Sequence, residues 1–326
     1  MRLHRVAEGS LAREFRRLSR SAGLTWVSGR MIPAPAPMGA QGIGAGAESC
    51  FPRLRRGCIK VAGVIALAEL ICGVDLGSRS VKIALAERGI GEGLGRILRL
   101  ERVDTIAFYR NYGRKEGDKL SVDFARLGLE SVQTLVSTGY GRNTLELAGG
   151  EAIPELKAHV LGAMYQSGLR DFTLVDLGGQ DSKIIQVRKG KMVDFQTNDK
   201  CAASSGRYLE NMAHVLGMSL EELGRHAEDP VELNSTCAVF GESELIGKIV
   251  EGRPLCKLAA GVNATIVRRI LPLLRSFPGE KLVFTGGVAY NQAVRKLLAD
   301  GSGREVTVPA EPQFNGAIGC CLYPEV

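Results

Sequence analysis

The chain has 326 residues, of which 45% are hydrophobic, and a formal net charge of +7. That length is enough to bury a large core and fits one or two domains. The positive excess belongs to residues 1–60, which hold eleven Lys and Arg against three Asp and Glu and leave the remainder about neutral. A nucleic-acid-binding face on the folded part is therefore not expected, and the sequence has no charge-free apolar run long enough to span a membrane.

Residues 1–69 are expected to be a basic tail rich in Pro, Gly and Ala, with too little bulky apolar surface to offset the entropy of ordering. This tail is interpreted as disordered or as an over-long start, with Met31 as an internal alternative. Its basic beginning is not followed by a compact apolar segment, as a secretory signal would be. A cytoplasmic protein is therefore predicted, in which the eight cysteines stay reduced.

The most informative feature is an internal repeat at an offset of 101 residues. The letters V-D-L-G-S of Val74–Ser78 are echoed by V-D-L-G-G in Val175–Gly179, and Lys82 is echoed by Lys183. Each copy consists of an apolar strand, a D-x-G turn and a second β-rich strand, so each begins with a β-hairpin. Parallel dinucleotide-binding units do not begin in this way.

A third strand is expected after each hairpin, near residues 96–103 and 191–195, and helices follow, including 155–165 and 206–216. The repeat therefore predicts an α/β fold made of two β-β-β-α-β-α halves that face each other across a nucleotide cleft. The expected division has three parts: a tail over 1–69, a first half over 70–165, and a second half over 166–326 whose last helix returns to the first half or stays with the second.

The two D-x-G turns are suited to binding the phosphates of a nucleotide. Gly77 in the first turn, and Gly178 and Gly179 in the second, allow backbone conformations that point N–H groups at an anion. The carboxylates of Asp75 and Asp176 lie at the strand ends, where they can bind Mg²⁺ directly or through its waters. One such turn is usually only structural, but two in register predict a cleft that grips ATP from both sides.

A third glycine turn follows further along the chain. A strand that ends in V-F-T-G-G-V (283–288) leads into a helix near Asn291. Gly286 and Gly287 allow a nucleoside to pack closely against the backbone. In this order the three elements resemble the actin, sugar-kinase and heat-shock-chaperone ATPase superfamily, in which they are the first phosphate motif, the second phosphate motif and the adenosine motif.

Two cysteines of the second half stand just before predicted helices: Cys201 in N-D-K-C-A-A and Cys237 in S-T-C-A. A thiolate near a helix N-terminus has a lowered pKa and is suited to binding a metal. An iron–sulfur or zinc site needs about four ligands, so one chain supplies too few and a two-fold dimer would supply enough. The residues alone leave a second reading open, in which both cysteines are buried and structural.

From about residue 70 to 322 the chain resembles the activator (component A) of 2-hydroxyacyl-CoA dehydratases. The wider family comprises the acyl-CoA dehydratase activases and the ATPase subunits of benzoyl-CoA reductases. The resemblance rests on motifs that agree in order and spacing: D-L-G-S at 75–78, T-G-Y-G-R at 138–142, D-L-G-G-Q-D-S-K at 176–183, N-D-K-C-A-A at 198–203, S-T-C at 235–237, T-G-G-V at 285–288 and F-x-G-A-I-G at 314–319.

The resemblance implies an ATPase that forms a homodimer around one bridging 4Fe–4S cluster, held by Cys201 and Cys237 of each subunit. Hydrolysis of Mg-ATP would drive a low-potential electron into a dehydratase or related reductase, with a ferredoxin or flavodoxin as the electron donor. Asp75, Asp176 and Gln180 are the expected catalytic residues, with Gln180 either orienting the attacking water or only binding phosphate. Besides the turn glycines and Asn291, the expected nucleotide-binding side chains are Ser78, Ser80, Lys82, Asp181 and Lys183.

Two other functions remain open at this point. A small-molecule kinase of the same superfamily would leave Cys201 and Cys237 unexplained, and a nucleotide-binding regulatory dimer would use them to hold zinc. His159 is expected to be structural, although it matches the family. Glu242 and Glu244 are expected either on a solvated helix face or near the nucleotide.

Overall fold

The computed structural model describes residues 24–27, 30–33, 58–61, 64–67, 69–88, 94–116, 119–122, 125–129, 131–139, 145–146, 150–198, 205–234 and 237–323. They belong to two compact units, Met1–Pro52 and Arg53–Val326. Most of the expected tail lies outside the described residues, as does Cys201.

Two short antiparallel hairpins are described within residues 1–69. The first unit contains β1 (Leu24–Val27) paired with β2 (Arg30–Pro33). The second unit begins with β3 (Cys58–Val61) paired with β4 (Val64–Leu67).

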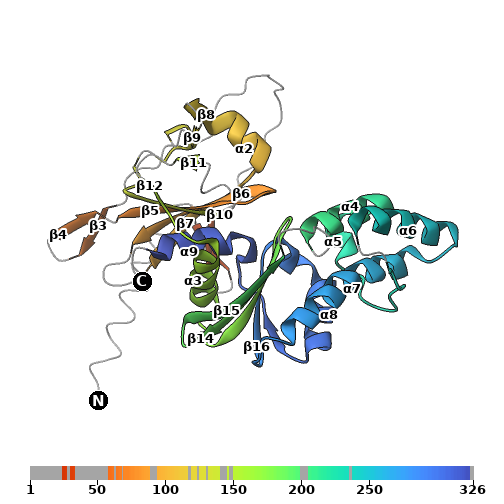
Figure 1. Ribbon diagram of the computed structural model, residues 1–326. Helices are drawn as coiled ribbons and strands as arrows, with labels where there is room; N and C mark the ends of the chain where they lie inside the picture. The colour runs from red at the N-terminus through yellow and green to blue at the C-terminus, as the bar shows by residue number, and fades with distance from the viewer. Residues whose placement is uncertain are drawn as a thin grey trace, which may run out of the picture. The chain divides into compact units, whose positions relative to one another are not determined.

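The first of two five-stranded sheets has the strand order β12-β10-β5-β6-β7 (Figure 1). Its strands are β5 (Leu70–Leu76), β6 (Ser80–Arg88), β7 (Leu94–Asp104), β10 (Thr134–Gly139) and β12 (Gly150–Ala152). β6 is antiparallel to both of its neighbours, β5 and β7. On the other side of the sheet, β10 is parallel to β5 and β12 is parallel to β10. The first D-x-G turn therefore connects two central strands.

The second sheet repeats this arrangement strand for strand, in the order β15-β14-β13-β16-β17. Its strands are β13 (Phe172–Leu177), β14 (Ser182–Arg188), β15 (Lys191–Asn198), β16 (Lys281–Thr285) and β17 (Glu305–Thr307). The antiparallel and parallel pairs fall at the same places as in the first sheet. The predicted duplicated α/β fold of the actin, sugar-kinase and chaperone ATPases is thus confirmed, with a fifth strand added to each half.

The register of the two hairpins places the same residue types opposite each other. Asp75 lies opposite Lys82 across β5 and β6, and Asp176 lies opposite Lys183 across β13 and β14. Cross-strand neighbours on one sheet face are close enough for their side chains to interact. The repeat in the sequence therefore becomes two equivalent Asp–Lys pairs.

The equivalence extends to the parallel strand beside each aspartate. Thr138 of β10 lies opposite the first aspartate and Thr285 of β16 lies opposite the second. Each threonine is followed by a glycine with positive φ, 95° at Gly139 and 86° at Gly286. A Cβ would lie 2.7 Å from a leucine carbonyl oxygen at Gly139 and 2.2 Å from one at Gly286, so both positions require glycine.

Pleating decides which way the aspartates point. In β13, Phe172 and Leu174 pack with residues of the helix α3 (Glu155–Ser167) on one face of the sheet. Val175 and Leu177 pack into the core on the opposite face. Because side chains alternate along a strand, Asp176 points to the α3 side, where the first half also lies.

Two helices lie between the sheets (Figure 1). α9 (Asn315–Leu322), from the end of the chain, packs on β5, β6 and β10, whereas α3 packs on β13, β14 and β16. The two helices also pack against each other, and glycines allow backbone contact where they meet. A Cβ would lie 2.0 Å from Asn315 O at Gly162 and 1.8 Å from Ala158 O at Gly319.

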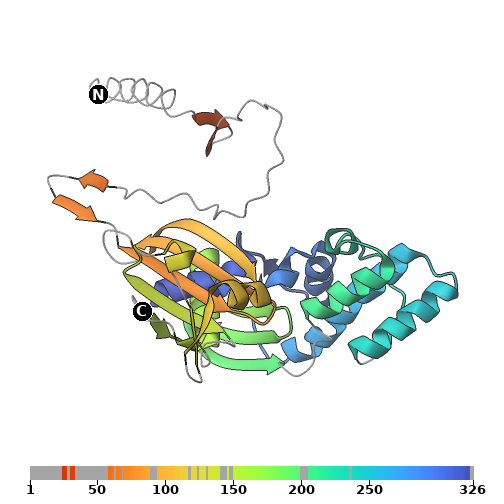
Figure 2. The same ribbon diagram turned by 90° about the horizontal axis from the view of Figure 1, so that it is seen from above.

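The helices of residues 206–302 lie together to one side of the sheets in both views (Figures 1 and 2). They are α4 (Gly206–Leu216), α5 (Leu220–Leu223), α6 (Ala238–Val250), α7 (Leu255–Leu274) and α8 (Gln292–Ser302). With the outer face of the second sheet they enclose the largest hydrophobic core. This core holds the second D-x-G hairpin and α4 in one packed body.

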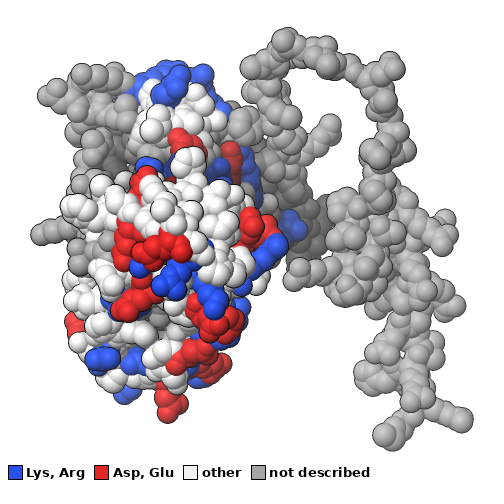
Figure 3. All heavy atoms as spheres, turned by 90° about the vertical axis from the view of Figure 1, so that its right-hand side faces the viewer, with Lys and Arg blue, Asp and Glu red and all other residues white. Residues whose placement is uncertain are grey.

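The remaining described elements are short. They are α2 (Thr105–Tyr112), three strands that form a small sheet, and three 3-10 helices: β8 (Gly113–Glu116), β9 (Lys119–Val122), β11 (Leu145–Glu146), η1 (Ala125–Leu127), η4 (Gly287–Tyr290) and η5 (Pro312–Phe314). None of the helices in the described ranges is long and apolar enough to cross a membrane. On the face that carries α6, acidic and basic side chains are interspersed (Figure 3).

Replacement of Gly319 by alanine tests the helix crossing. The added methyl group would meet the backbone of α3, so we expect the free energy of unfolding to fall by about 1–3 kcal/mol. Gly247→Ala in α6 is the matched control, because no atom lies within 4 Å of a Cβ there. Alanine favours a helix over glycine by about 0.5–1 kcal/mol, so this control should be neutral or stabilising in urea unfolding. Equal stability of the two variants would contradict the backbone contact.

Candidate functional site

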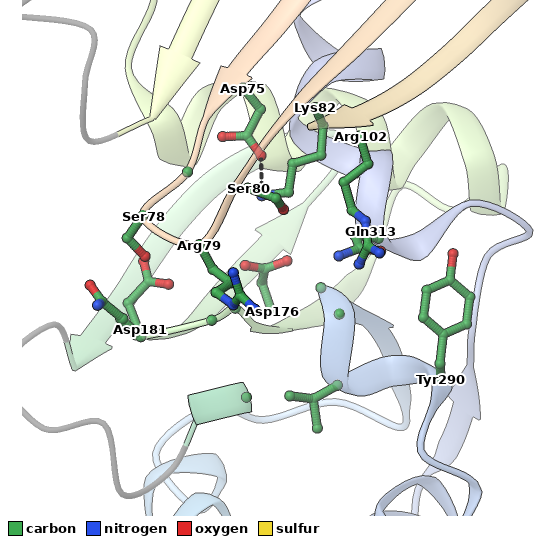
Figure 4. A pocket seen from close by; sticks show the side chains of 18 of the residues that line it. Asp75, Ser78, Arg79, Ser80, Lys82, Arg102, Asp176, Asp181, Tyr290 and Gln313 are labelled. Carbon is green, nitrogen blue, oxygen red and sulfur yellow. Dashed lines mark hydrogen bonds and ion pairs between the residues drawn. The ribbon is translucent and has the colours of Figure 1, made fainter. Parts of the chain in front are cut away.

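A cavity of about 730 Å³ lies between the two D-x-G turns and η4 (Figure 4). All fourteen residues predicted to bind or hydrolyse the nucleotide line it: Asp75, Gly77, Ser78, Ser80, Lys82, Asp176, Gly178, Gly179, Gln180, Asp181, Lys183, Gly286, Gly287 and Asn291. The structure therefore brings together three segments, 75–82, 176–183 and 286–291, that are far apart in the chain. Their individual roles stay predictions.

Lys82 and Thr105 hold the first D-x-G turn in place. Asp75 is only 3% exposed at the end of β5, and its Oδ2 lies 3.2 Å from Lys82 Nζ. Thr105, at the start of α2, donates its hydroxyl to the Gly77 carbonyl at 2.7 Å. A Cβ at Gly77 would lie 2.7 Å from Lys82 Nζ, so glycine lets the lysine reach into the turn.

The second turn has the same plan, but its lysine contacts three carboxylates. Asp176 is 2% exposed and accepts a hydrogen bond of 2.8 Å from the Thr285 hydroxyl. Lys183 Nζ lies 3.7 Å from Asp176 Oδ2 and 2.9 Å from Glu155 Oε1, and it also contacts Asp181. Burial works against the charge of Lys183, but these three carboxylates outweigh it and raise its pKa.

His159 of α3 lies on the floor of the cavity between the two halves. Its Nδ1 lies 3.3 Å from Asp176 Oδ1 without the alignment of a hydrogen bond, and its Nε2 lies 3.9 Å from Glu155. A Cβ at Gly316 of α9 would lie 3.1 Å from His159 Nε2 and 3.2 Å from Asp75 Oδ2. The imidazole therefore contacts Asp176 and lies close to the Asp75 carboxylate, a more specific position than the structural role expected from the sequence.

The charges of this floor stabilise one another. Burial opposes ionisation of Asp176, but His159 and Lys183, with the Thr285 hydroxyl, outweigh it and hold its pKa below the usual range. Burial likewise lowers the pKa of His159, but the Asp176 and Asp75 carboxylates outweigh burial and raise it. Buried charges need such partners, and the same set of oxygens and ammonium groups can bind a divalent cation and phosphates.

Asn291 lies at the third glycine turn and has a mainly structural set of contacts. Its Oδ1 accepts the Val294 N–H at 2.9 Å and so caps α8. Its Nδ2 donates to Asn263 Oδ1 at 2.9 Å, and Asn263 in turn donates to the carbonyls of Leu223 and His226. One amide hydrogen of Asn291 is left for the cavity, which limits the nucleotide-binding role predicted for it.

Other residues of the cavity were not singled out from the sequence. They include Arg79, Arg102, Asp104, Glu155, Leu209, Glu210, Leu220, Glu221, Tyr290 and Gln313. Arg79 was open to prediction because it lies inside the first D-x-G hairpin. Arg102, Tyr290 and Gln313 come from a sheet edge and two 3-10 helices, where neither spacing nor residue type distinguishes them.

Of the two predicted cluster cysteines, the structure describes only Cys237. Cys237 is the N-cap residue of α6, just before a helix as the sequence predicts, and the structure shows it partly exposed. Cys201 lies outside the described residues, and across the described part of the chain no three His, Cys, Asp or Glu side chains form a metal-binding group. Glu242 and Glu244 do not line the cavity, and Glu244 instead accepts the Asn234 N–H at 2.8 Å.

Three other cysteines have no access to solvent. Cys72 of β5 and both Cys320 and Cys321 of α9 are buried, and burial raises the pKa of each thiol. They are therefore packing residues rather than reactive thiols. Cys256, in contrast, is exposed on α7.

Comparison with known proteins agrees with this geometry. The model of the BadF/BadG/BcrA/BcrD ATPase family matches residues 72–324. The (R)-2-hydroxyglutaryl-CoA dehydratase activating ATPase of Acidaminococcus fermentans is 39% identical over 203 residues, which are 61% of this chain and 78% of the relative. The activator of lactoyl-CoA dehydratase of Anaerotignum propionicum is 34% identical over 256 residues, 77% of this chain and 95% of the relative.

Among solved structures, the activator of the 2-hydroxyisocaproyl-CoA dehydratase from Clostridium difficile, with bound ADPNP, superimposes with a TM-score of 0.66. It is 29% identical, and the match covers 78% of this chain and 93% of that one. The family model spans nearly all of the folded part, and the resemblance seen in the motifs is confirmed. The chain belongs to the BadF/BadG/BcrA/BcrD ATPase family.

Proposed function

We propose that this ATPase activates an acyl-CoA dehydratase or a related reductase by coupling ATP hydrolysis to donation of a low-potential electron. The observation that carries the proposal is the convergence of both D-x-G turns on one cavity whose wall includes the start of α4, the helix that follows the Cys201 segment. The names of the relatives, which are activators of dehydratases, support the choice of partner.

ATP would bind with its phosphates between the two turns. The turn N–H groups, Lys82 and Lys183 would neutralise the phosphates, and Asp75 and Asp176 would hold Mg²⁺ through their carboxylate oxygens. Bound ADPNP in the solved structure from Clostridium difficile supports a nucleotide in this fold. Gln180 is exposed in the second turn, where its amide can orient a water molecule toward the terminal phosphate.

A 4Fe–4S cluster would be held by the thiolates of Cys237 and Cys201. The fit rests on Cys237, which is partly exposed, forms no disulfide and is the N-cap residue of α6. When bound, such a cluster transfers one electron at a potential set by its charge, hydrogen bonds and exposure. The protein's part would be to hold the ligands and change those surroundings.

A homodimer would complete the ligand set, because each chain offers two of about four thiolates. The residues just after Cys237 support this: Val239 and Phe240 are 70% and 68% exposed. Large apolar side chains so close to a predicted ligand are typical of a surface that is covered in the assembly. A reduced ferredoxin or flavodoxin in the cytoplasm would reload the cluster.

Asp176→Asn tests the ATPase site. The amide keeps the shape and the Thr285 contact but removes a charge that would hold Mg²⁺, so the turnover number should fall about 100-fold or more. Phosphate release at saturating Mg-ATP measures it. Asp300→Asn is the control, since Asp300 is an exposed residue of α8 that pairs with Lys296. Turnover of Asp176→Asn equal to that of Asp300→Asn would contradict the proposed role.

Cys237→Ser tests the cluster independently of the ATPase. Anaerobically reconstituted parent protein should contain about four irons and four sulfides per dimer, and this variant should contain none. Cys256→Ser is the matched control, because Cys256 is an exposed thiol nearby in sequence that the proposal leaves without a metal. A full complement of iron in Cys237→Ser would end the bridging proposal while leaving the ATPase assignment intact.

A further inference from the structure

Arg79 is the residue of the first D-x-G turn that reaches across to the second half. Its Nη1 lies 2.6 Å from Asp104 Oδ2, and its Nε lies 3.3 Å from Glu210 Oε1. Asp104 caps α2 by accepting the N–H groups of Ile106 and Ala107 at 3.0 and 3.1 Å. The guanidinium therefore joins α2 of the first half to α4 of the second, and Figure 4 shows the Arg79 side chain among those that line the cavity.

The start of α4 is also bound to the second D-x-G turn. The backbone N–H groups of Gly206 and Arg207 donate to the carbonyls of Gly178 and Gly179, both at 2.9 Å. These N–H groups belong to the first helical turn, where no partner exists within the helix. The helix start is thereby fixed to one phosphate turn through its backbone.

The two phosphate turns touch each other at Arg79. A Cβ at Gly179 would lie 2.7 Å from Arg79 Cβ, so the second turn packs directly on the side chain of the first. Glu210 lies one turn into α4, beyond the backbone bonds that fix the helix start. The Arg79–Glu210 pair is therefore a contact between the first half and α4 that is separate from the backbone bonds to the second turn.

We propose that Arg79 is a positioning residue that exchanges Glu210 for a nucleotide phosphate, so that binding in the cleft releases α4 from the first half. The proposal deepens the proposed function and rests on it, because α4 begins five residues after Cys201. A guanidinium forms the same paired hydrogen bonds with a carboxylate and with a phosphate, so the two anions compete for it.

The exposure of the pair suits an exchange. The side chains of Arg79 and Glu210 are 46% and 35% exposed. Ion pairs at such sites shift an equilibrium only about two- to fivefold, so a multiply charged phosphate can displace the carboxylate. A buried pair would lock α4 in one position instead.

The test is a double-mutant cycle on the affinity for Mg-ADPNP, measured by equilibrium titration of the full chain. Glu210→Gln removes the competing charge and should tighten binding about two- to fivefold. Arg79→Ala should weaken binding, and the double variant should bind like Arg79→Ala alone. Glu228→Gln, which breaks an exposed pair with Lys296 away from the cavity, is the control and should bind like the parent.

Each outcome has a distinct meaning. Tightening by Glu210→Gln that persists in the Arg79→Ala background would show plain charge repulsion by Glu210 and would overturn the exchange. Unchanged or weaker binding by Glu210→Gln would overturn it as well. A parent protein that binds no Mg-nucleotide would instead refute the proposed function itself.

Hydrogen exchange of α4 gives a second readout that a merely structural pair would not produce. In the parent, Mg-ADPNP should speed exchange of the amides near Glu210, because the pair to the first half is broken. In Glu210→Gln these amides should exchange at the faster rate with or without nucleotide. Exchange that responds equally to nucleotide in parent and variant would contradict the proposal.

Discussion

The site depends on the backbone contact between α3 and α9. Gly162 and Gly319 let these helices approach until the backbone of one meets the backbone of the other. α9 packs on the first sheet and α3 packs on strands of both sheets, so the crossing ties the two halves together at their inner faces. A side chain at either glycine would separate the sheets and with them Asp75 and Asp176.

The close approach of the two halves brings the Asp75 and Asp176 carboxylates toward each other, and residues of α3 and α9 lie beside them. Two carboxylates on facing sheets would repel each other if nothing lay between them. His159 from α3 fills this position, Lys82 and Lys183 stand beside the carboxylates on the neighbouring strands, and glycine at position 316 leaves room for the ring. Burying such a group of charges adds little to stability, so its retention points to a chemical use.

The two hairpins and the predicted nucleotide-binding residues could be found in the sequence, because the D-x-G turn and the strand pattern around it occur twice, 101 residues apart. The sequence did not reveal that Thr138-Gly139 and Thr285-Gly286 are equivalent, since the intervening segments differ in length and shift the offset. Whether α9 returned to the first sheet was left open, because a helix gives no sign in sequence of which sheet it packs on. His159 was undervalued for a similar reason: its partner Asp176 lies on another element, and only the three-dimensional fold brings them together.

In the proposed site, both D-x-G turns hold one Mg-nucleotide at once. The most direct measurement is a crystal structure with ADPNP and Mn²⁺, in which anomalous scattering locates the metal. We expect a single metal peak between the Asp75 and Asp176 carboxylates, bound directly or through water, with the phosphates between Gly77 and Gly179. A metal-nucleotide that contacts only one turn, or that binds outside this cavity, would contradict it.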